Sequence, residues 1–319
     1  MDKTDIRILS LLGENPRTTF SEMAKKLDLS VAAIQHRLGS MESSGLILEY
    51  GAYVNLGSIG GSKVIVTGQL SGKLESESIK TIEKQGSIMY LSLGTSNTLF
   101  VQAALHRISD LDELMRFIEL NCRVLNPEVY FVGGASSSVP FLTDDSLVGD
   151  NDSLTDLDCR IMKSIHKDAR KPFAIIANEV GASTKTVKKR LAKMLESNRM
   201  VYCLTSRTVA PGVLGFDLFV KLRSSASRVS VAKSLRENPL FNLSSYILIS
   251  NVLDMLYVSI FTETVKEASE IINALRNQPE VVTVKANLIT EEYFFETWVD
   301  RMIEEGKIRS RQFKKNKAT

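Results

Sequence analysis

Five basic side chains are concentrated within nine residues of this chain, at Lys185, Lys188, Lys189, Arg190 and Lys193. Glu196 is the one acidic residue that follows closely behind them. When such a cluster lies against a nucleic acid, it neutralises phosphates and releases condensed counterions. A run of charged residues is otherwise only the solvated face of a helix. Whether these side chains bind a nucleic acid therefore depends on the structural element that carries them.

An internal repeat defines that element. Residues 2–48 and 155–201 align without a gap at a constant offset of 153. Identical residues recur along the whole alignment, for example in the pairs Asp5 and Asp158, Arg17 and Arg170, Phe20 and Phe173, Ser30 and Ser183, Arg37 and Arg190, and Met41 and Met194. A repeat of this length is one folding unit used twice.

Each copy is predicted to form three short helices. In the first copy, helical apolar spacing runs over about 2–13, and Thr19 with Glu22 has the form of a capping box. Ser30 is a good N-cap for a third helix that ends at about Ser43, before Gly45. In the second copy Pro172 takes the first helical position and Ser183 caps the third helix.

Three such helices are the pattern of a helix-turn-helix, in which the third helix enters the major groove of DNA. The basic cluster falls on that helix in the second copy. We therefore expect double-stranded DNA as a partner, with a generic three-helix bundle as the alternative. The predicted contacts in this copy are Ser183, Thr184, Lys185, Lys188, Lys189, Arg190 and Lys193.

The third helix of the first copy differs, because it is nearly neutral. It carries Gln35, which can hydrogen-bond a base edge, and His36 and Arg37, which can reach phosphate or base. Two unlike recognition helices should not read a simple palindrome. We expect either an asymmetric DNA target, or one module that binds the DNA strongly while the other adjusts the binding.

After each helical module the chain takes on β character. Segments 46–56 and 200–210 are expected to form a wing and a connecting strand. The order strand, helix, two strands, helix, strand then follows twice and predicts ferredoxin-like units. The expected elements are 63–70, 75–85, 88–93, 98–105, 110–120 (capped by Ser109) and 128–132, then 216–223, 228–237, 244–250, 255–261, 265–277 and 281–289.

The predicted fold is thus α+β, with two winged helix-turn-helix domains and two ferredoxin-like domains in tandem. The expected divisions are 1–56, 62–139, a linker at 140–153, 154–210, 214–290, and a C-terminal helix with a basic tail at 291–319. A sheet covered on one face by helices needs a partner on the other. We expect the sheet domains to pair within the chain or in a homo-oligomer.

Composition excludes several classes of protein. The 319 residues are 44% hydrophobic and 24% charged, as in globular proteins, and the net charge of +3 does not by itself indicate nucleic-acid binding. Three scattered cysteines indicate neither disulfides nor a metal site, and favour a reducing cytoplasm. We find no secretory signal and no apolar run of the ~20 residues that span a bilayer. No cofactor is expected.

The order of modules resembles the Lrp/AsnC family of transcription regulators. The resemblance is carried by residues 4–17, Thr-Asp-Ile-Arg-Ile-Leu-Ser-Leu-Leu-Gly-Glu-Asn-Pro-Arg, and by their second copy. It covers about 2–135 and again 155–290, as if two members were fused. It implies a DNA-binding regulator whose sheet domains sense a small-molecule effector such as an amino acid.

Family members often carry a Gly-x-x-Asp turn between the second and third strands. The matching turns here are Gly94-Thr95-Ser96-Asn97 and Asn251-Val252-Leu253-Asp254. The resemblance implies effector binding at Gly94, Thr95, Ser96, Asn97, Asn251 and Asp254, and a plain hairpin turn is the alternative. A related branch, the siroheme decarboxylases, handles a tetrapyrrole, so an enzyme using His106 is a rival hypothesis, as is an interaction scaffold.

Overall fold

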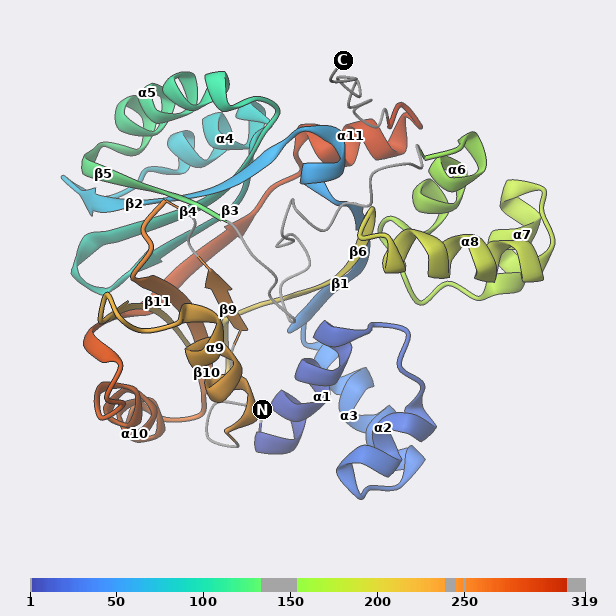
Figure 1. Ribbon diagram of the computed structural model, residues 1–319, viewed down its shortest axis with the longest axis horizontal. Coiled ribbons are helices and arrows are strands. Elements are labelled where there is room, and N and C mark those ends of the chain that lie inside the picture. The colour runs from blue at the N-terminus through green and yellow to red at the C-terminus, as the bar shows by residue number, and fades with distance from the viewer. Residues whose placement is uncertain (1, 133–153, 239–244, 249–250, 309–319) are drawn as a thin grey trace, which may run out of the picture.

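The two helical modules lie beside the sheet domains in the computed structural model, which describes residues 2–132, 154–238, 245–248 and 251–308 (Figure 1). We call the two modules the first head and the second head. The first head comprises α1 (Lys3–Glu14), α2 (Phe20–Leu27) and α3 (Val31–Ser43). The second head comprises α6 (Asp156–Ile165), α7 (Phe173–Val180) and α8 (Thr184–Glu196). Both predicted three-helix units are confirmed.

The helix ends are set by local capping, as the sequence predicts. The Thr19 side chain accepts a hydrogen bond from the Glu22 amide, and Glu22 Oε2 accepts one from the Thr19 amide at 2.7 Å. Ser30 caps α3 and Ser183 caps α8, each through a 3.1 Å bond from the amide three residues on. Pro172 differs by one position, because it is the N-cap of α7 and not its first helical residue.

The two heads are joined by a two-stranded ribbon. Strand β1 (Ile47–Val54) follows the first head, and β6 (Met200–Ser206) follows the second. They pair with each other in antiparallel register, with Gly51 opposite Cys203. We expected a wing within each head. The structure instead pairs the two wing strands with each other, so we call this pair the inter-head ribbon.

In each head a loop joins the first and second helices. The loop of the first head and the loop of the second head contact each other reciprocally. The Arg17 guanidinium donates to the carbonyls of Ala169 and Lys171 and lies 4.0 Å from the centroid of the Phe173 ring.

Its repeat equivalent, Arg170, does the same in the other direction. It donates to the carbonyls of Pro16 and Thr18 and lies 5.3 Å from the ring of Phe20. The two acceptor carbonyls and the phenylalanine ring of one arginine are those of the other, displaced by the repeat offset of 153, and Arg170 also lies 5.3 Å from the ring of Tyr50. Such mutual exchange is the property of a two-fold interface. The heads of one chain are therefore arranged as a pseudo-dimer.

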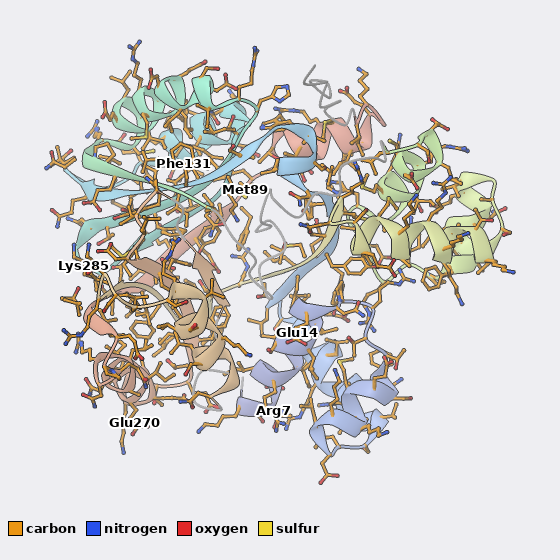
Figure 2. The ribbon with its side chains drawn as sticks, in the orientation of Figure 1. Arg7, Glu14, Met89, Phe131, Glu270 and Lys285 are labelled. Atoms are coloured by element: carbon orange, nitrogen blue, oxygen red, sulfur yellow. The ribbon has the colours of Figure 1, made fainter. Side chains whose placement is uncertain are left out.

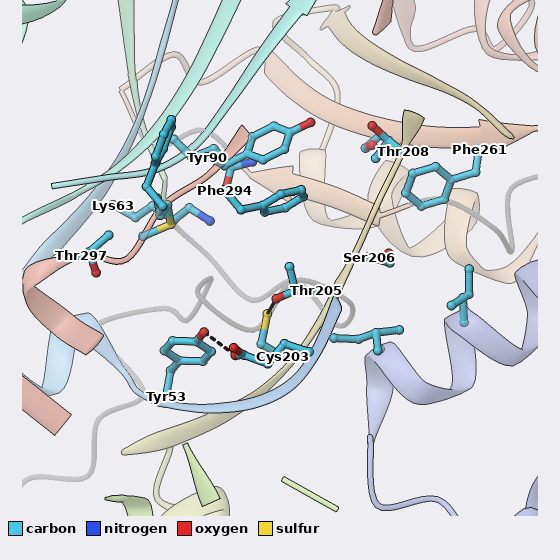
Figure 3. Close-up of a pocket in the computed structure, with 18 of the residues that line it drawn as sticks. Tyr53, Lys63, Tyr90, Cys203, Thr205, Ser206, Thr208, Phe261, Phe294 and Thr297 are labelled. Carbon is cyan, nitrogen blue, oxygen red and sulfur yellow. Dashed lines mark hydrogen bonds between the residues drawn. The ribbon is translucent and has the colours of Figure 1, made fainter. Parts of the chain in front are cut away.

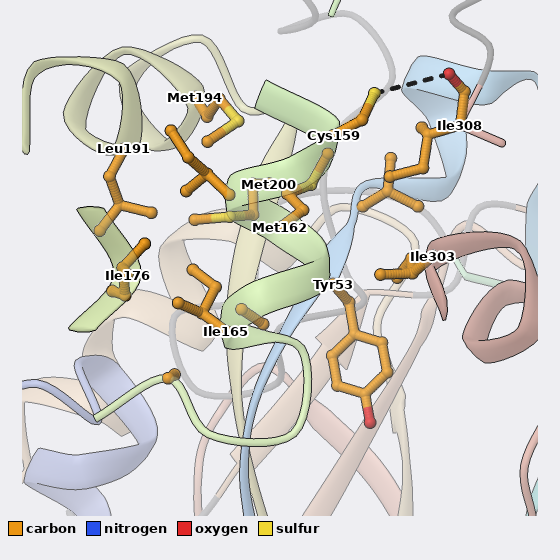
Figure 4. Close-up of a cluster of buried hydrophobic side chains, with 14 of the residues drawn as sticks. Tyr53, Cys159, Met162, Ile165, Ile176, Leu191, Met194, Met200, Ile303 and Ile308 are labelled. Carbon is orange, nitrogen blue, oxygen red and sulfur yellow. Dashed lines mark hydrogen bonds between the residues drawn. The ribbon is translucent and has the colours of Figure 1, made fainter. Parts of the chain in front are cut away.

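The second head is also anchored by the C-terminal part of the chain. Figure 4 shows Ile303 of α11 (Trp298–Glu304) and Ile308 packed beside Met162 on α6 and Tyr53 on β1. His166, at the end of α6, lies 3.2 Å from Asp300 of α11, and its carbonyl accepts the Ala52 amide at 2.8 Å.

Each sheet domain has the predicted order βαββαβ. The first contains β2 (Ser62–Leu70), α4 (Ser76–Gln85), β3 (Ile88–Gly94), β4 (Thr98–Leu105), α5 (Leu111–Cys122) and β5 (Val124–Phe131). The second contains β8 (Val213–Leu222), α9 (Arg228–Glu237), β9 (Ser245–Leu248), β10 (Met255–Thr262), α10 (Val265–Arg276) and β11 (Val281–Phe294). The short strand β7 (Val209–Ala210) pairs with β8. Three short 3₁₀ turns complete the described elements: Leu56–Ile59, Thr95–Asn97 and Ile108–Asp110.

The two domains form one continuous sheet, in the order β5-β2-β4-β3-β11-β8-β10-β9. Strand β11 makes the junction, because Val284 pairs with Val220 in its own domain and Glu292 pairs with Ser92 in the other. The helices lie on the outer faces (Figure 1). Figure 2 shows Glu270 and Lys285, both exposed, at the outer margin of the second domain.

The inner faces meet through aromatic side chains. Phe100 of the first domain stacks on Tyr257 of the second, with ring centroids 5.1 Å apart, and Tyr130 meets Phe219 at 5.4 Å. Sheet faces that would need a second subunit are thus covered within the chain. The sheet domains pair intramolecularly, which was one of the two predicted arrangements.

Two predicted elements are wrong. The expected C-terminal helix does not begin at residue 291, because β11 continues to Phe294 through pairing with β3 and the helix α11 begins at Trp298. Ser109 does not cap α5, since it lies in the 3₁₀ turn Ile108–Asp110, where Asp110 accepts the Arg107 amide at 2.9 Å.

The linker at 140–153 and tail residues 309–319 lie outside the described residues. Among the helices that are described, each is too short or too polar to cross a membrane.

Replacing either interlocking arginine by alanine should destabilise the heads to a similar degree. Arg17→Ala and Arg170→Ala each remove charge-assisted hydrogen bonds to two carbonyls and a contact with an aromatic ring, so we expect a loss of about 2–4 kcal/mol each. Urea unfolding measures this free energy, with exposed Arg116→Ala on α5 as control. A large loss for one arginine and none for the other would contradict the pseudo-two-fold arrangement.

Candidate functional site

The basic cluster occupies the outer face of α8. Val187, Leu191 and Met194 are buried in the core of the second head. Helical geometry then turns the intervening residues outward. Lys185, Lys188, Lys189 and Lys193 are all exposed, and so are Ser183 and Thr184 at the start of the helix. The lysines are therefore available to a partner, as a DNA-contacting helix requires.

One lysine of this face is linked to the contact between the heads. The Lys188 ammonium lies 5.2 Å from the centroid of the Phe173 ring, and Arg17 of the first head lies over the same ring. Cations over an aromatic face are held by the ring quadrupole. The position of α8 is thus coupled to the position of the first head.

The two arginines of the predicted DNA contacts hold ion pairs inside their own heads. Arg37 Nη1 lies 2.7 Å from Asp2 and 2.8 Å from Asp5, and Arg190 Nη1 lies 3.5 Å from Asp158. Asp5 and Asp158 are equivalent in the repeat, so the same pair braces the third helix against the first in both heads. About a third of each arginine side chain is exposed. The lysines of α8 are the better placed cations.

The outer face of α3 has different chemistry. Gln35 and His36 are exposed, and the neighbouring exposed positions are Ala32 and Ser40. Ile34, Leu38 and Met41 fill the core. This face offers hydrogen-bonding groups and little charge, so the predicted asymmetry between the two recognition helices is present on the surface.

The first predicted effector turn packs against the sheet junction. Gly94 ends β3, and a Cβ atom there would come within 1.9 Å of the Asn287 side chain on β11. Thr95 Oγ1 donates to Asn287 Oδ1 at 3.3 Å. Asn97 takes the left-handed conformation with φ of 56°. Close packing on β11 accounts for the glycine without a ligand.

The second turn also has internal partners. The Asn251 side chain accepts the Phe131 amide at 2.8 Å and donates to the Val129 carbonyl at 2.9 Å, which fastens the second domain to strand β5 of the first. Asp254 lies 2.8 Å from Lys221. Effector binding at these turns stays a prediction, and the observed contacts are those of structural turns.

A cavity lies elsewhere, between the inter-head ribbon and the continuous sheet. Its volume is about 360 Å³. Residues from both heads and both sheet domains line it, among them Leu9, Tyr53, Lys63, Tyr90, Cys203, Asp217, Tyr257 and Phe294. Met89, labelled in Figure 2, lies on β3 and also lines the cavity. No local motif could have revealed this cavity, because its wall is assembled from strands far apart in the sequence.

Lys63 and Asp217 are two of the buried charged groups that line this cavity. Lys63 is 3% exposed, and burial lowers its pKa to about 8. Asp217 is 2% exposed, and burial raises its pKa to about 6, although hydrogen bonds from Tyr257 and Ser92 oppose the shift. Each retains charge near neutral pH only against the cost of burial. Buried ionisable groups in a cavity mark a candidate binding site.

The candidate enzyme residue is not part of this cavity. His106 is exposed, and its ring lies 4.6 Å from that of Trp298, whose indole donates to the Ala104 carbonyl at 2.8 Å. In the part of the chain that the structure describes, no cluster of three or more His, Cys, Asp or Glu side chains is arranged to hold a metal ion.

Sequence comparison matches both heads. A family described as winged helix-turn-helix DNA-binding matches residues 1–47, and the AsnC-type helix-turn-helix domain matches residues 154–195. The HTH-type transcriptional regulator LrpA of Pyrococcus horikoshii is 38% identical over 68 residues, which are 21% of this chain and 48% of LrpA. The chain thus spans about half the length of this curated relative.

A second relative and one solved structure extend over the sheet domains. The HTH-type transcriptional regulator LrpA1 of Halobacterium salinarum is 22% identical over 140 residues, which are 44% of this chain and 92% of that protein. The crystal structure of the siroheme decarboxylase NirDL covers 95% of this chain and 98% of its own, with a TM-score of 0.52 and 12% identity. That likeness concerns the fold. Both heads are thus similar to helix-turn-helix domains of the winged and AsnC types, and the chain is similar to Lrp-type regulators over part of its length.

Proposed function

We propose that the protein is a cytoplasmic, sequence-specific DNA-binding transcription regulator. The observation that carries the proposal is the exposed lysine face of α8, which lies on the helix that enters the major groove in helix-turn-helix proteins. The relatives named as transcriptional regulators and the helix-turn-helix families that match both heads support it. Such lysines supply electrostatic affinity that is independent of sequence.

The two heads are proposed to address one duplex. Their reciprocal contact fixes them in one chain as a pseudo-dimer, and two-fold helix-turn-helix dimers bind half-sites about one helical turn, ~34 Å, or a multiple of it, apart. The target departs from a palindrome because α8 presents lysines while α3 presents Gln35 and His36. The second head supplies most of the affinity, and the first adds a distinct half-site.

A tetrapyrrole-handling enzyme is the second candidate, favoured only by the fold shared with NirDL. Fold does not specify chemistry. His106, its candidate residue, stacks on Trp298 outside the cavity. The cavity, at about 360 Å³, is near the lower end for small-molecule sites and suits a ligand smaller than a macrocycle. We therefore infer a non-catalytic protein. A Soret absorption band in the purified protein would overturn that inference.

Charge reversal on α8 tests the proposal. The double variant Lys188→Glu and Lys189→Glu should abolish retention on genomic DNA, because two phosphate contacts become repulsive. The matched control is Lys80→Glu with Lys84→Glu on α4, which changes the net charge equally on an exposed helix of a sheet domain. Gel-shift titrations measure both. Equal DNA affinity for the two double variants would favour the scaffold alternative.

Arg37, which is held in ion pairs within its own head, should affect DNA binding less than the α8 lysines do. Arg37→Met removes an ion pair with Asp2 and Asp5 that is partly exposed, so we expect a loss of stability of about 1 kcal/mol or less. The slope of log affinity against log salt should not change, whereas neutralising each α8 lysine that contacts phosphate should reduce it by about one. A slope reduced by Arg37→Met would place this arginine on DNA.

Gln35 should contribute specificity. Gln35→Ala is expected to cost about 1–3 kcal/mol at one base position and to relax selection there, because an amide can pair with a base edge in the major groove. Binding-site selection with purified wild-type and variant protein measures the preference at every position. Exposed Ser43→Ala, at the far end of α3, is the control. An unchanged selected site would remove Gln35 from the interface.

A further inference from the structure

One imidazole joins the second head to two other elements of the chain. The His166 side chain, at the end of α6, is 2% exposed. Its Nδ1 lies 3.1 Å from the carbonyl oxygen of Ala52 on β1, and its Nε2 lies 3.2 Å from Asp300 Oδ1 on α11. The second contact has the distance of an ion pair without the alignment of a hydrogen bond. The second head, the inter-head ribbon and α11 therefore meet at this ring.

Both oxygens that face the ring are acceptors. Ala52 offers a backbone carbonyl, and contacts with His166 and Thr297 hold the pKa of Asp300 below its usual value although burial opposes this. A neutral imidazole has a proton on one nitrogen and a lone pair on the other. Either neutral tautomer would direct that lone pair at an oxygen, whereas the imidazolium directs an N–H at each. The geometry thus favours the charged ring.

The side of the ring toward β1 adds further negative charge. Tyr53 meets the His166 ring edge-on, with centroids 4.8 Å apart, and its hydroxyl donates to Glu49 at 2.8 Å (Figure 3). Burial raises the pKa of both Glu49 and Tyr53. For His166 itself, burial lowers the pKa, but Asp300, the Ala52 carbonyl and Glu49 outweigh it and place the pKa above its usual value.

The other charged groups nearby limit how the contact is measured. Lys167 is paired with Glu296 and with Glu304 of α11, and these contacts raise its pKa, so it stays charged. Burial raises the pKa of Cys203 on β6 to about 12. Burial also lowers the pKa of Lys63, which lines the cavity beside the ribbon, to about 8. Because Lys63 titrates near neutral pH, the effect of His166 must be measured by comparing variants.

The repeat gives this contact to one head only. His166 corresponds to Gly13 at the offset of 153, and glycine has no side chain with which to make it. We propose that His166 is a pH-operated clamp, which holds the second head on β1 and α11 while the imidazole is protonated and loosens when the ring loses its proton. The two heads would then differ in how firmly they are held as the pH changes.

The clamp has a defined pH window. Because the folded state raises the pKa of His166, its stabilisation is complete below the unfolded value of ~6.5 and is lost as the pH rises through the folded value. Because the folded state lowers the pKa of Asp300, its stabilisation is present above the unfolded value of ~3.9 and is lost as the pH falls through the folded value. The clamp is therefore strongest between pH ~4 and ~6.5.

Nuclear magnetic resonance of the full chain, labelled with ¹³C-histidine, measures the titration directly, because the sequence contains only His36, His106 and His166. The variants His36→Gln and His106→Gln assign the ring signals. The signal of His166 should titrate above ~6.5. Asp300→Asn should lower this pKa by at least one unit, because it removes the anion, whereas Asp112→Asn on an exposed position of α5 should leave it unchanged.

Amide hydrogen exchange separates a clamp from a titration that has no structural effect. Between pH 6 and 9, after correction for the intrinsic exchange rate, the opening constant of α6 and α11 should rise by up to tenfold for each unit by which folding raises the pKa of His166. His166→Gln should show the larger opening constant already at pH 6. Asp300→Asn provides the comparison if the glutamine variant does not fold, and the amides of α1 in the first head are the internal control.

Three results would each overturn the proposal. The first is a pKa of His166 at or below ~6.5, and the second is a pKa that Asp300→Asn does not change. The third is an opening of α6 and α11 that depends on pH in His166→Gln, or in Asp300→Asn, as strongly as in the wild type. DNA takes no part in these measurements, so their failure leaves the proposed function standing.

Discussion

The reciprocal contact between Arg17 and Arg170 is the constraint on which the arrangement of the heads depends. Each guanidinium donates to two backbone carbonyls of the opposite head and lies over its phenylalanine ring. The donors, acceptors and rings of this contact are equivalent in the repeat. The contact therefore holds α3 and α8, which differ in sequence, in the two-fold arrangement that two identical subunits would adopt. A duplicated chain can then change one helix without changing the other, and the exposed face of α8 carries lysines where that of α3 carries Gln35 and His36.

The body that carries the heads is built on the same principle of internal pairing. Strand β11 belongs to the second sheet domain and completes the first, and Glu292 within it accepts hydrogen bonds from the Thr208 and Val209 amides at 2.9–3.1 Å. Stacked aromatic side chains then close the inner faces of the sheet. The inter-head ribbon lies against this body and encloses the cavity. Linking the halves in one chain replaces a bimolecular association by an intramolecular one.

Local signals predicted most of the elements, and long-range pairing explains the failures. Caps at Thr19, Ser30 and Ser183 and the apolar periodicity placed the head helices within a residue or two, because those signals act within one helical turn. The crossing of β1 to β6 and the extension of β11 to Phe294 depend on partners far along the chain, so periodicity could not show them. The α8 lysines were predictable from spacing, whereas the ion pairs of Arg37 and Arg190 and the cavity lined by Lys63 depend on contacts between distant parts of the chain.

We propose that the two heads of one chain read one duplex. Hydroxyl-radical footprinting on a selected site, with the number of bound chains counted by mass measurement of the complex, tests it most directly. We expect two protected patches of unequal strength on one face of the duplex, about one helical turn or a multiple of it apart, from a single chain. One patch for each bound chain, or two patches that appear only when a second chain binds, would contradict it.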